Sequence, residues 1–76
     1  MRLLKVSLKL AANVKSFVNI VSKYPYPVIL SGGRFKIDAK SLLGIFSLDI
    51  SKPLTLEIHS EDCDDLIKEL EKFVVR

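Results

Sequence analysis

The order of hydrophobic and polar residues predicts a strand followed by a helix at the start of the chain. Leu4, Val6 and Leu8 alternate with polar residues, which is the pattern of a half-buried strand over residues 3–8. From residue 11 to residue 24 apolar side chains recur at intervals of three and four, as on one face of an amphipathic helix. These side chains are Val14, Phe17, Val18 and Val21. Pro25 and Pro27 end the helix, because proline has no backbone N–H and restricts the residue before it.

A hairpin and a short helix are predicted in the middle of the chain. Two extended segments, residues 28–30 and 34–38, flank the sequence Ser31-Gly32-Gly33, whose glycines are expected to supply the positive φ angles of a tight turn. We expect Phe35 and Ile37 to face the core from the second segment. Ser41 is the expected N-cap of a short apolar helix that runs from Leu42 to about Leu48.

The last third of the chain predicts one more strand and one more helix. Residues 54–58 alternate again, and the acidic residues between Ser60 and Asp65 open a helix near the positive end of its dipole. Its expected buried stripe is Cys63, Ile67, Leu70 and Val74, with Leu66 and Phe73 alongside. The order β-α-β-β-α-β-α over one domain, residues 1–76, predicts the α+β class, with a four-stranded antiparallel sheet and its three helices on one face.

Composition narrows the class of protein. The chain is 49% hydrophobic and 28% charged, which is typical of a globular domain. No apolar run approaches the roughly 20 residues that a membrane span needs, and the first residues do not form a signal peptide, so we expect no membrane association. The single cysteine, Cys63, cannot form an internal disulfide, which fits a cytoplasmic location.

Charge is distributed unevenly along the chain. Nine Lys and Arg face two acids through residue 52, whereas seven acids face three basic residues after it. The acids gather at the predicted start of the last helix, which gives most of this asymmetry a local structural cause. The lysines are scattered and lack interleaved aromatic residues, so the pattern does not favour nucleic-acid binding. The sequence also offers no metal-ligand cluster, no phosphate-binding glycine loop and no catalytic triad, and we expect neither a metal nor a cofactor.

The segment Lys40–Leu48 carries a family resemblance. Its sequence, K-S-L-L-G-I-F-S-L, is similar to the K-S-I-M-G-V-M-S-L segment of the HPr (histidine-containing phosphocarrier) family, with identity at five of nine positions. Ser22-Lys23-Tyr24 matches the family's S-K-[FY], and the order of elements also matches. The resemblance covers nearly the whole chain and implies the family's open-faced β-sandwich.

The family's phosphoryl-accepting motif, H-A-R-P, is not present in this chain. An ungapped count back from Ser22 places it on Leu10-Ala11-Ala12-Asn13, so that the histidine becomes Leu10 and the arginine becomes Ala12. The side chain of leucine has no lone pair and cannot accept a phosphoryl group. The loss of the arginine also removes a guanidinium group whose paired N–H donors suit phosphate. The resemblance therefore implies a member that is neither a phosphocarrier nor an enzyme.

His59 and Cys63 are the other candidates for nucleophilic chemistry. His59 falls at the far end of the last strand, and in the implied fold that end lies opposite the start of the first helix. We therefore expect an exposed histidine without a catalytic role. Cys63 lies on a predicted buried stripe, so we expect it in the core, although a helix dipole could lower the pKa of its thiol.

The resemblance also implies which residues bind partners. In HPr-like proteins of Gram-positive bacteria the serine matching Ser41 is phosphorylated by a dedicated kinase, and a phosphate here would meet a helix N-terminus beside Lys40. The alternative is an ordinary N-cap serine. The positions matching Leu42, Leu43 and Phe46 form an apolar docking patch in the family, and the position of Ala12 belongs to the same partner surface.

Three functional hypotheses follow from these residues. The first is a non-catalytic regulatory adaptor, related to the sugar phosphotransferase system, that binds a protein partner through the Leu42–Phe46 helix; enzyme I, HPr kinase or a transcriptional regulator would be the partner by resemblance. The second is a decoy or competitor for enzyme I. The third is a small basic module that binds anions or nucleic acid. We expect a monomer or a weak dimer.

Overall fold

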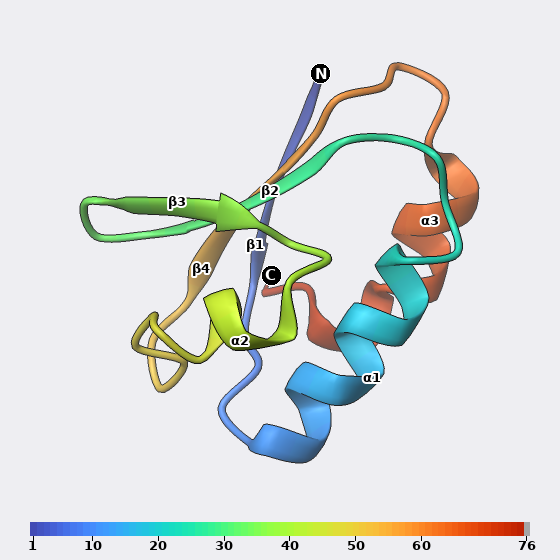
Figure 1. Ribbon diagram of the computed structural model, residues 1–76. Helices are drawn as coiled ribbons and strands as arrows, with labels where there is room; N and C mark the ends of the chain where they lie inside the picture. Colours follow the sequence, from blue (N-terminus) through green and yellow to red (C-terminus); the bar gives the residue numbers. More distant parts are fainter. Residues whose placement is uncertain (76) are drawn as a thin grey trace.

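The protein is described by a computed structural model that covers residues 1–75; Arg76, the last residue of the predicted domain, lies outside the described part. The elements are β1 (Arg2–Val6), α1 (Ala11–Val21), β2 (Val28–Gly32), β3 (Phe35–Asp38), α2 (Leu42–Ile45), β4 (Leu54–Ile58) and α3 (Asp64–Glu69), followed by a 3₁₀ turn, η1 (Glu71–Phe73). Their order is the one that the sequence predicts, and the class is α+β (Figure 1).

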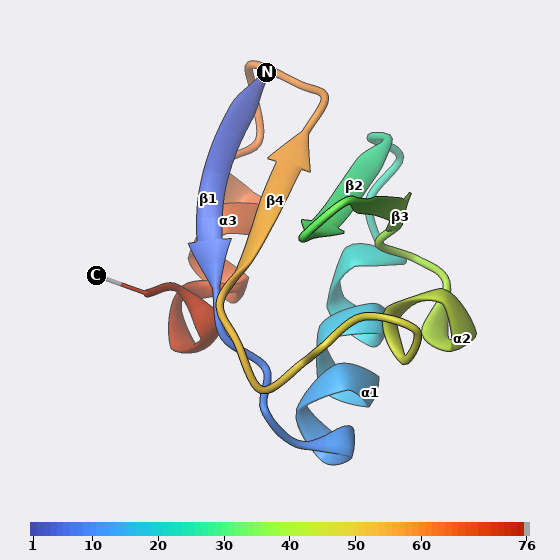
Figure 2. The ribbon, with the colours of Figure 1, turned by 90° about the vertical axis from the view of Figure 1, so that its left-hand side faces the viewer.

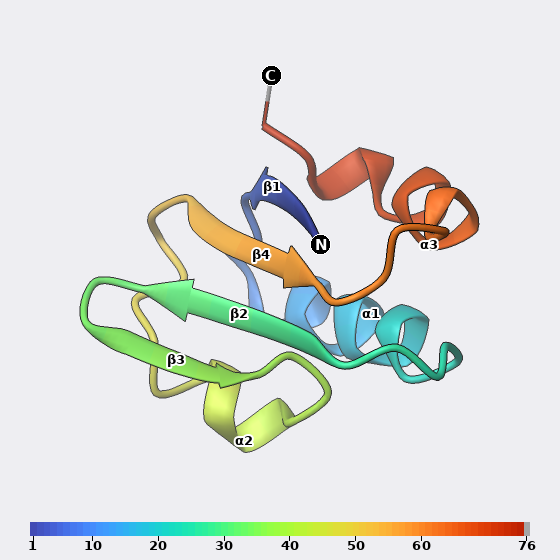
Figure 3. The ribbon, with the colours of Figure 1, turned by 90° about the horizontal axis from the view of Figure 1, so that it is seen from above.

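The four strands form one antiparallel sheet in the order β1-β4-β2-β3. Leu56 of the central strand β4 lies between Leu4 of β1 and Leu30 of β2, so the apolar positions of three strands share one face. The helices cover this face and leave the other face open, which makes the fold the predicted open-faced sandwich (Figures 2 and 3). On the open face the ammonium of Lys36 pairs with Glu57 across the strands at 3.1 Å.

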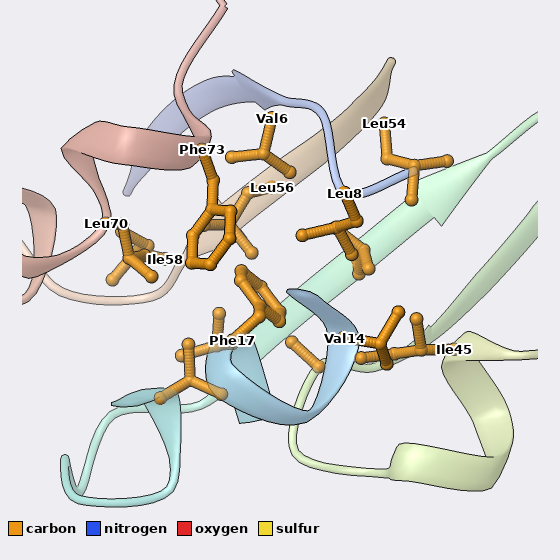
Figure 4. Packing of buried hydrophobic residues seen from close by; sticks show 14 of the residues in the cluster. Val6, Leu8, Val14, Phe17, Ile45, Leu54, Leu56, Ile58, Leu70 and Phe73 are labelled. Atoms are coloured by element: carbon orange, nitrogen blue, oxygen red, sulfur yellow. The ribbon is translucent and has the colours of Figure 1, made fainter. Parts of the chain in front are cut away.

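A single core fills the space between the sheet and the helices (Figure 4). Phe17 of α1 and Phe73 of η1 meet edge to face at its centre, with ring centroids 6.0 Å apart. Among the described residues no polar or charged residue is buried. The buried residues are Val6, Leu8, Val14, Phe17, Val21, Val28, Leu30, Ala39, Ile45, Leu48, Leu54, Leu56, Ile58, Cys63, Leu66, Leu70 and Phe73.

The β2–β3 hairpin differs from the prediction in two respects. Only Gly33 has a positive φ, of 58°, whereas Gly32 ends β2 and pairs with Phe35. A Cβ on Gly32 would lie 2.7 Å from Cδ2 of Leu54, so glycine is needed there for close packing rather than for its dihedral angles. Phe35 was expected in the core but is 66% exposed, because the end of the hairpin extends past α2 (Figure 3). Ile37, nearer to α2, packs against the core as predicted.

The helices are shorter than predicted. Helix α1 ends at Val21 rather than Tyr24, and α2 ends at Ile45 rather than near Leu48. Helix α3 ends at Glu69, and the chain continues through a 3₁₀ turn into an extended Val74. Val74 bridges Val6 at the edge of β1, so it does not continue a helical stripe. The buried positions of this segment are therefore Cys63, Leu66, Leu70 and Phe73, while Ile67 and Val74 are only partly buried.

Candidate partner-binding surface

The start of α1 exposes a large apolar side chain. Leu10 is the N-cap residue, has extended backbone angles and is 64% exposed. Its side chain cannot accept a hydrogen bond, so the first turn of α1 has no side-chain cap. Ala12, in the same turn, is also exposed. Leu10 and Ala12 thus expose apolar side chains at this helix start, and neither side chain carries a nucleophile.

The connection into α1 is held by specific backbone contacts. Lys9 adopts a left-handed conformation with a φ of 66°, which is uncommon for a residue with a side chain. Its backbone N–H donates to the carbonyl of Ile50 at 2.9 Å, and the side-chain amide of Asn13 donates to the carbonyl of Leu8 at 2.6 Å. These two contacts tie the residues before α1 to the α2–β4 connection and to the helix itself, so they fix the place of Leu10.

Ser41 caps α2 as the sequence predicts. Its Oγ accepts a hydrogen bond from the backbone N–H of Gly44 at 3.1 Å, and its side chain is half-buried. A Cβ on Gly44 would lie 3.0 Å from this Oγ and 3.4 Å from Cδ1 of Ile37. Glycine at position 44 therefore lets the serine cap the helix while α2 packs closely on β3.

Helix α2 presents two apolar side chains to solvent and directs two others inward. Leu43 is 83% exposed and Phe46 is 42% exposed, whereas Ile45 is fully buried and Leu42 packs against the core. Helix α2 contacts α1, and Figure 1 shows both in the half of the molecule away from the N-terminus. We define the docking surface as Leu10, Ala12, Leu43 and Phe46. Leu42, predicted to bind a partner, has its main contacts inside the molecule.

Lys40 has an intramolecular contact. Its ammonium donates to the backbone carbonyl of Tyr24 at 2.7 Å, and its side chain is half-buried. This bond holds the segment before α2 against the turn that follows α1. The predicted role of Lys40 in partner binding gains no support from this contact.

His59 lies far from the start of α1. It follows the last residue of β4, at the end of the sheet near the N-terminus, whereas α1 begins beyond the opposite end of the sheet (Figure 1). The side chain is exposed, and its Nε2 lies 3.6 Å from the carboxylate of Glu57. His59 is therefore exposed and does not belong to the docking surface, and this position agrees with the one expected from the sequence.

Cys63 is fully buried in the core, as predicted. Its thiol donates a weak hydrogen bond to the carbonyl of Ser60 at 3.5 Å. Burial raises the pKa of the Cys63 thiol, and the neighbouring Arg2 offsets this only in part. A buried thiol with a raised pKa is a structural residue, because the thiolate is the reactive form.

The described residues form neither a metal-binding cluster nor a membrane-spanning helix. Residues 1–75 contain no group of three or more His, Cys, Asp or Glu side chains placed to hold a metal ion. None of the helices described combines the length and the apolar character required to cross a bilayer.

The family model for the PTS HPr component phosphorylation site matches residues 9–76, which is most of the chain. The chain belongs to the HPr family. Membership and fold together indicate a phosphocarrier-like protein of the phosphotransferase system, a family whose members carry phosphoryl groups and interact with other proteins of that system. A search of curated proteins finds no match.

Solved structures of the HPr family share the fold of this chain. HPr-C-His from Thermoanaerobacter tengcongensis is 26% identical, with a TM-score of 0.79 over 95% of this chain and 89% of that chain. The phosphocarrier protein HPr from Bacillus anthracis is 24% identical, with a TM-score of 0.75 over 97% of this chain and 94% of that chain, and supports the fold alone. Crh from Bacillus subtilis is 25% identical, with a TM-score of 0.65 over 96% of this chain and 90% of that chain; its structure is a domain-swapped, intertwined dimer.

Sequence reasoning missed the second exposed aromatic side chain of this HPr-family chain, Phe35. The alternation of residues 34–38 places Phe35 on the same face as Ile37, and that face was assumed to be covered throughout. The signal that could have located it is the length of the helix above it. With only four residues, α2 covers Ile37 and ends before it reaches the tip of the hairpin.

Proposed function

We propose that this chain is a non-catalytic regulatory adaptor of the phosphotransferase system, which binds a protein partner through the docking surface. The single observation that carries the proposal is the exposure of three large apolar side chains, Leu10, Leu43 and Phe46, on or at the ends of two helices that contact each other. Large apolar side chains that are exposed together mark an interaction site. The sequence supports the non-catalytic part, since its one histidine, His59, lies at the other end of the molecule.

We also propose that Ser41 is phosphorylated and that this modification controls partner binding. The serine is half-buried, and its oxygen already accepts the N–H of Gly44. A phosphate on this oxygen would keep that acceptor and add about two negative charges beside the exposed Leu43 and Phe46. The added charge would alter which partner the apolar surface accepts. Lys40 would join the phosphate only by leaving the carbonyl of Tyr24.

The direct test is the intact mass of the protein after two incubations. In the first it is mixed with enzyme I and phosphoenolpyruvate, and in the second with HPr kinase and ATP. We expect one phosphate to be added only in the second incubation, and none with Ser41→Ala. A phosphate acquired from phosphoenolpyruvate would contradict the non-catalytic assignment. A kinase reaction that leaves the protein unmodified would contradict the regulation at Ser41, without bearing on the docking surface.

The docking surface is tested separately, by calorimetric titration with enzyme I and with HPr kinase. We expect Leu43→Asp to weaken binding at least tenfold, because it places a charge on an apolar contact. The matched control is Leu3→Asp, which changes an exposed leucine on β1, the strand at the opposite edge of the sheet from β3. Equal binding by both variants, or no binding by the unmodified protein, would count against the surface.

A second candidate function is competition with HPr for enzyme I. The observation that favours it is the apolar Leu10 at the start of α1, in a chain of the HPr fold, because a surface of HPr shape without a phosphoryl acceptor there would occupy enzyme I unproductively. In an assay of phosphoryl transfer from enzyme I to HPr, a competitor lowers the rate in proportion to its occupancy. An adaptor that binds HPr kinase and not enzyme I leaves the rate unchanged.

A further inference from the structure

A groove lies between the tip of the β2–β3 hairpin and the connection that leads from α2 into β4. Its volume is about 360 Å³. The hairpin contributes Gly32 to Phe35, and the other wall is formed by Ser47, Leu48, Asp49 and Lys52 to Leu54. Leu10 and Leu43 do not line it, so the groove is separate from the docking surface.

The floor of the groove is apolar because the sheet extends beyond its helical cover. Phe35 points to the helix-covered face but is 66% exposed, and Leu48 and Leu54 lie beside it. Leu54 reaches this position only because residue 32 is glycine, since a Cβ there would lie 2.7 Å from its Cδ2. A ligand with an apolar body would cover the aromatic ring of Phe35, and the removal of this ring from water would stabilise the complex.

The rim of the groove carries two positively charged side chains, Arg34 and Lys52, and one carboxylate, Asp49, that already accepts hydrogen bonds. The side chain of Arg34 has no hydrogen-bond or ion-pair partner within residues 1–75, and the ammonium of Lys52 lies 3.9 Å from the carboxylate of Asp49. Asp49 is engaged by Ser51, whose backbone N–H and hydroxyl donate to the same carboxylate oxygen at 3.1 and 2.5 Å. The guanidinium of Arg34 is therefore available for an anion, and its fork matches a carboxylate.

We propose that this groove binds a small organic anion that has an aromatic body and one carboxylate. The volume lies at the lower end of the range for small-molecule sites, which fits a body of one or two rings. The ring stacks on Phe35 over the apolar floor, and the carboxylate pairs with Arg34 at the rim. Lys52 adds a second positive charge to the same side.

The test is a titration of the isotope-labelled protein with a naphthalene carboxylate and with the matching neutral carboxamide, followed through backbone amide shifts. We expect saturable shifts at Gly33, Phe35, Leu48 and Lys52 with the carboxylate, and binding at least about tenfold weaker with the carboxamide, because the charge-assisted hydrogen bond is lost. Arg34→Gln should weaken the carboxylate about tenfold and leave the carboxamide unchanged.

A pair of variants tests whether the ring of Phe35 takes part in binding. Phe35→Ala should abolish the shifts, whereas Leu3→Ala, which removes a similarly exposed apolar side chain on another strand, should leave them unchanged. Both residues are exposed, so both variants are expected to unfold at the same temperature as the unmodified protein. The proposal is overturned if no saturable shift appears, if the shifts centre outside the groove, if the two probes bind equally, or if Phe35→Ala binds normally.

Discussion

The hydroxyl oxygen of Ser41 accepts the backbone N–H of Gly44 at 3.1 Å, three residues further along the chain. This bond satisfies one of the N–H groups that the start of a helix leaves without a partner. Because α2 has only four residues, the cap is a large part of its hydrogen bonding. Ser41 therefore helps to hold α2 in its helical form, and with it the positions of Leu43 and Phe46 in the docking surface.

Replacement of the cap tests that dependence. Ser41→Ala should lower the free energy of unfolding by about 1 kcal/mol, whereas Ser41→Asp should lower it less, because aspartate also caps helices. The measurement is chemical denaturation, with Ser22→Ala as the control, since Ser22 is exposed and its side chain makes no hydrogen bond within residues 1–75. If Ser41→Ala unfolds at the same denaturant concentration as the unmodified protein, the cap does not stabilise α2.

The turn of the β2–β3 hairpin requires a residue that adopts a positive φ at position 33. Gly33 has a φ of 58° and no atom within 4 Å of the place where a Cβ would lie, so a side chain would meet no obstacle there except its own backbone. Gly33→Ala should therefore lower the free energy of unfolding by about 1 kcal/mol, and Gly33→Asn by less, because asparagine tolerates left-handed angles. Thermal unfolding measures both. Equal losses for alanine and asparagine would show that the backbone angle is not the cause.

Alternation and helical period were sufficient to predict the order of the elements, and the sequence K-S-L-L-G located the cap at Ser41. They failed where a neighbouring element determines the environment. Phe35 has the alternation of a buried residue, but no helix covers the tip of its hairpin. Val74 has the spacing of a helical stripe, but its backbone pairs with β1 instead: the N–H of Val75 donates to the carbonyl of Lys5 at 2.9 Å. Both outcomes depend on where distant segments end, and a local pattern does not contain that information.

Acid and alkali should destabilise the protein through one contact between α3 and the turn after α1. Lys23 and the hydroxyl of Tyr24 both donate to the carboxylate of Glu69, and they hold the pKa of Glu69 below its usual 4.5. The same hydrogen bond from the Tyr24 hydroxyl raises the pKa of Tyr24 from 10.0 to about 12. The fold thus favours the ionised glutamate and the neutral tyrosine.

The signs of the two effects follow from linkage. The contribution of Glu69 is complete above pH 4.5 and is lost as the pH falls through its lowered pKa, whereas that of Tyr24 is complete below pH 10.0 and is lost as the pH rises through about 12. Glu69→Gln should therefore flatten the acid side of the plot of unfolding free energy against pH, and Tyr24→Phe should flatten the alkaline side. Asp62→Asn, which removes an exposed carboxylate, is the control. Unchanged slopes in both variants would contradict this assignment.

The alignment of Leu10 with the family's histidine leads to a gain-of-function prediction. Leu10 and Ala12 are both exposed at the start of α1, so changing them should cost little stability. In the double variant Leu10→His, Ala12→Arg, an imidazole lone pair would lie beside free helix N–H groups and a guanidinium that stabilise a phosphate. We expect this variant to acquire one phosphate from phosphoenolpyruvate and enzyme I, measured by intact mass, while the unmodified protein acquires none. Leu3→His, near the other end of β1, should acquire none either. A folded double variant that binds enzyme I but remains unmodified would show that Leu10 does not occupy the position of the phosphoryl-accepting histidine.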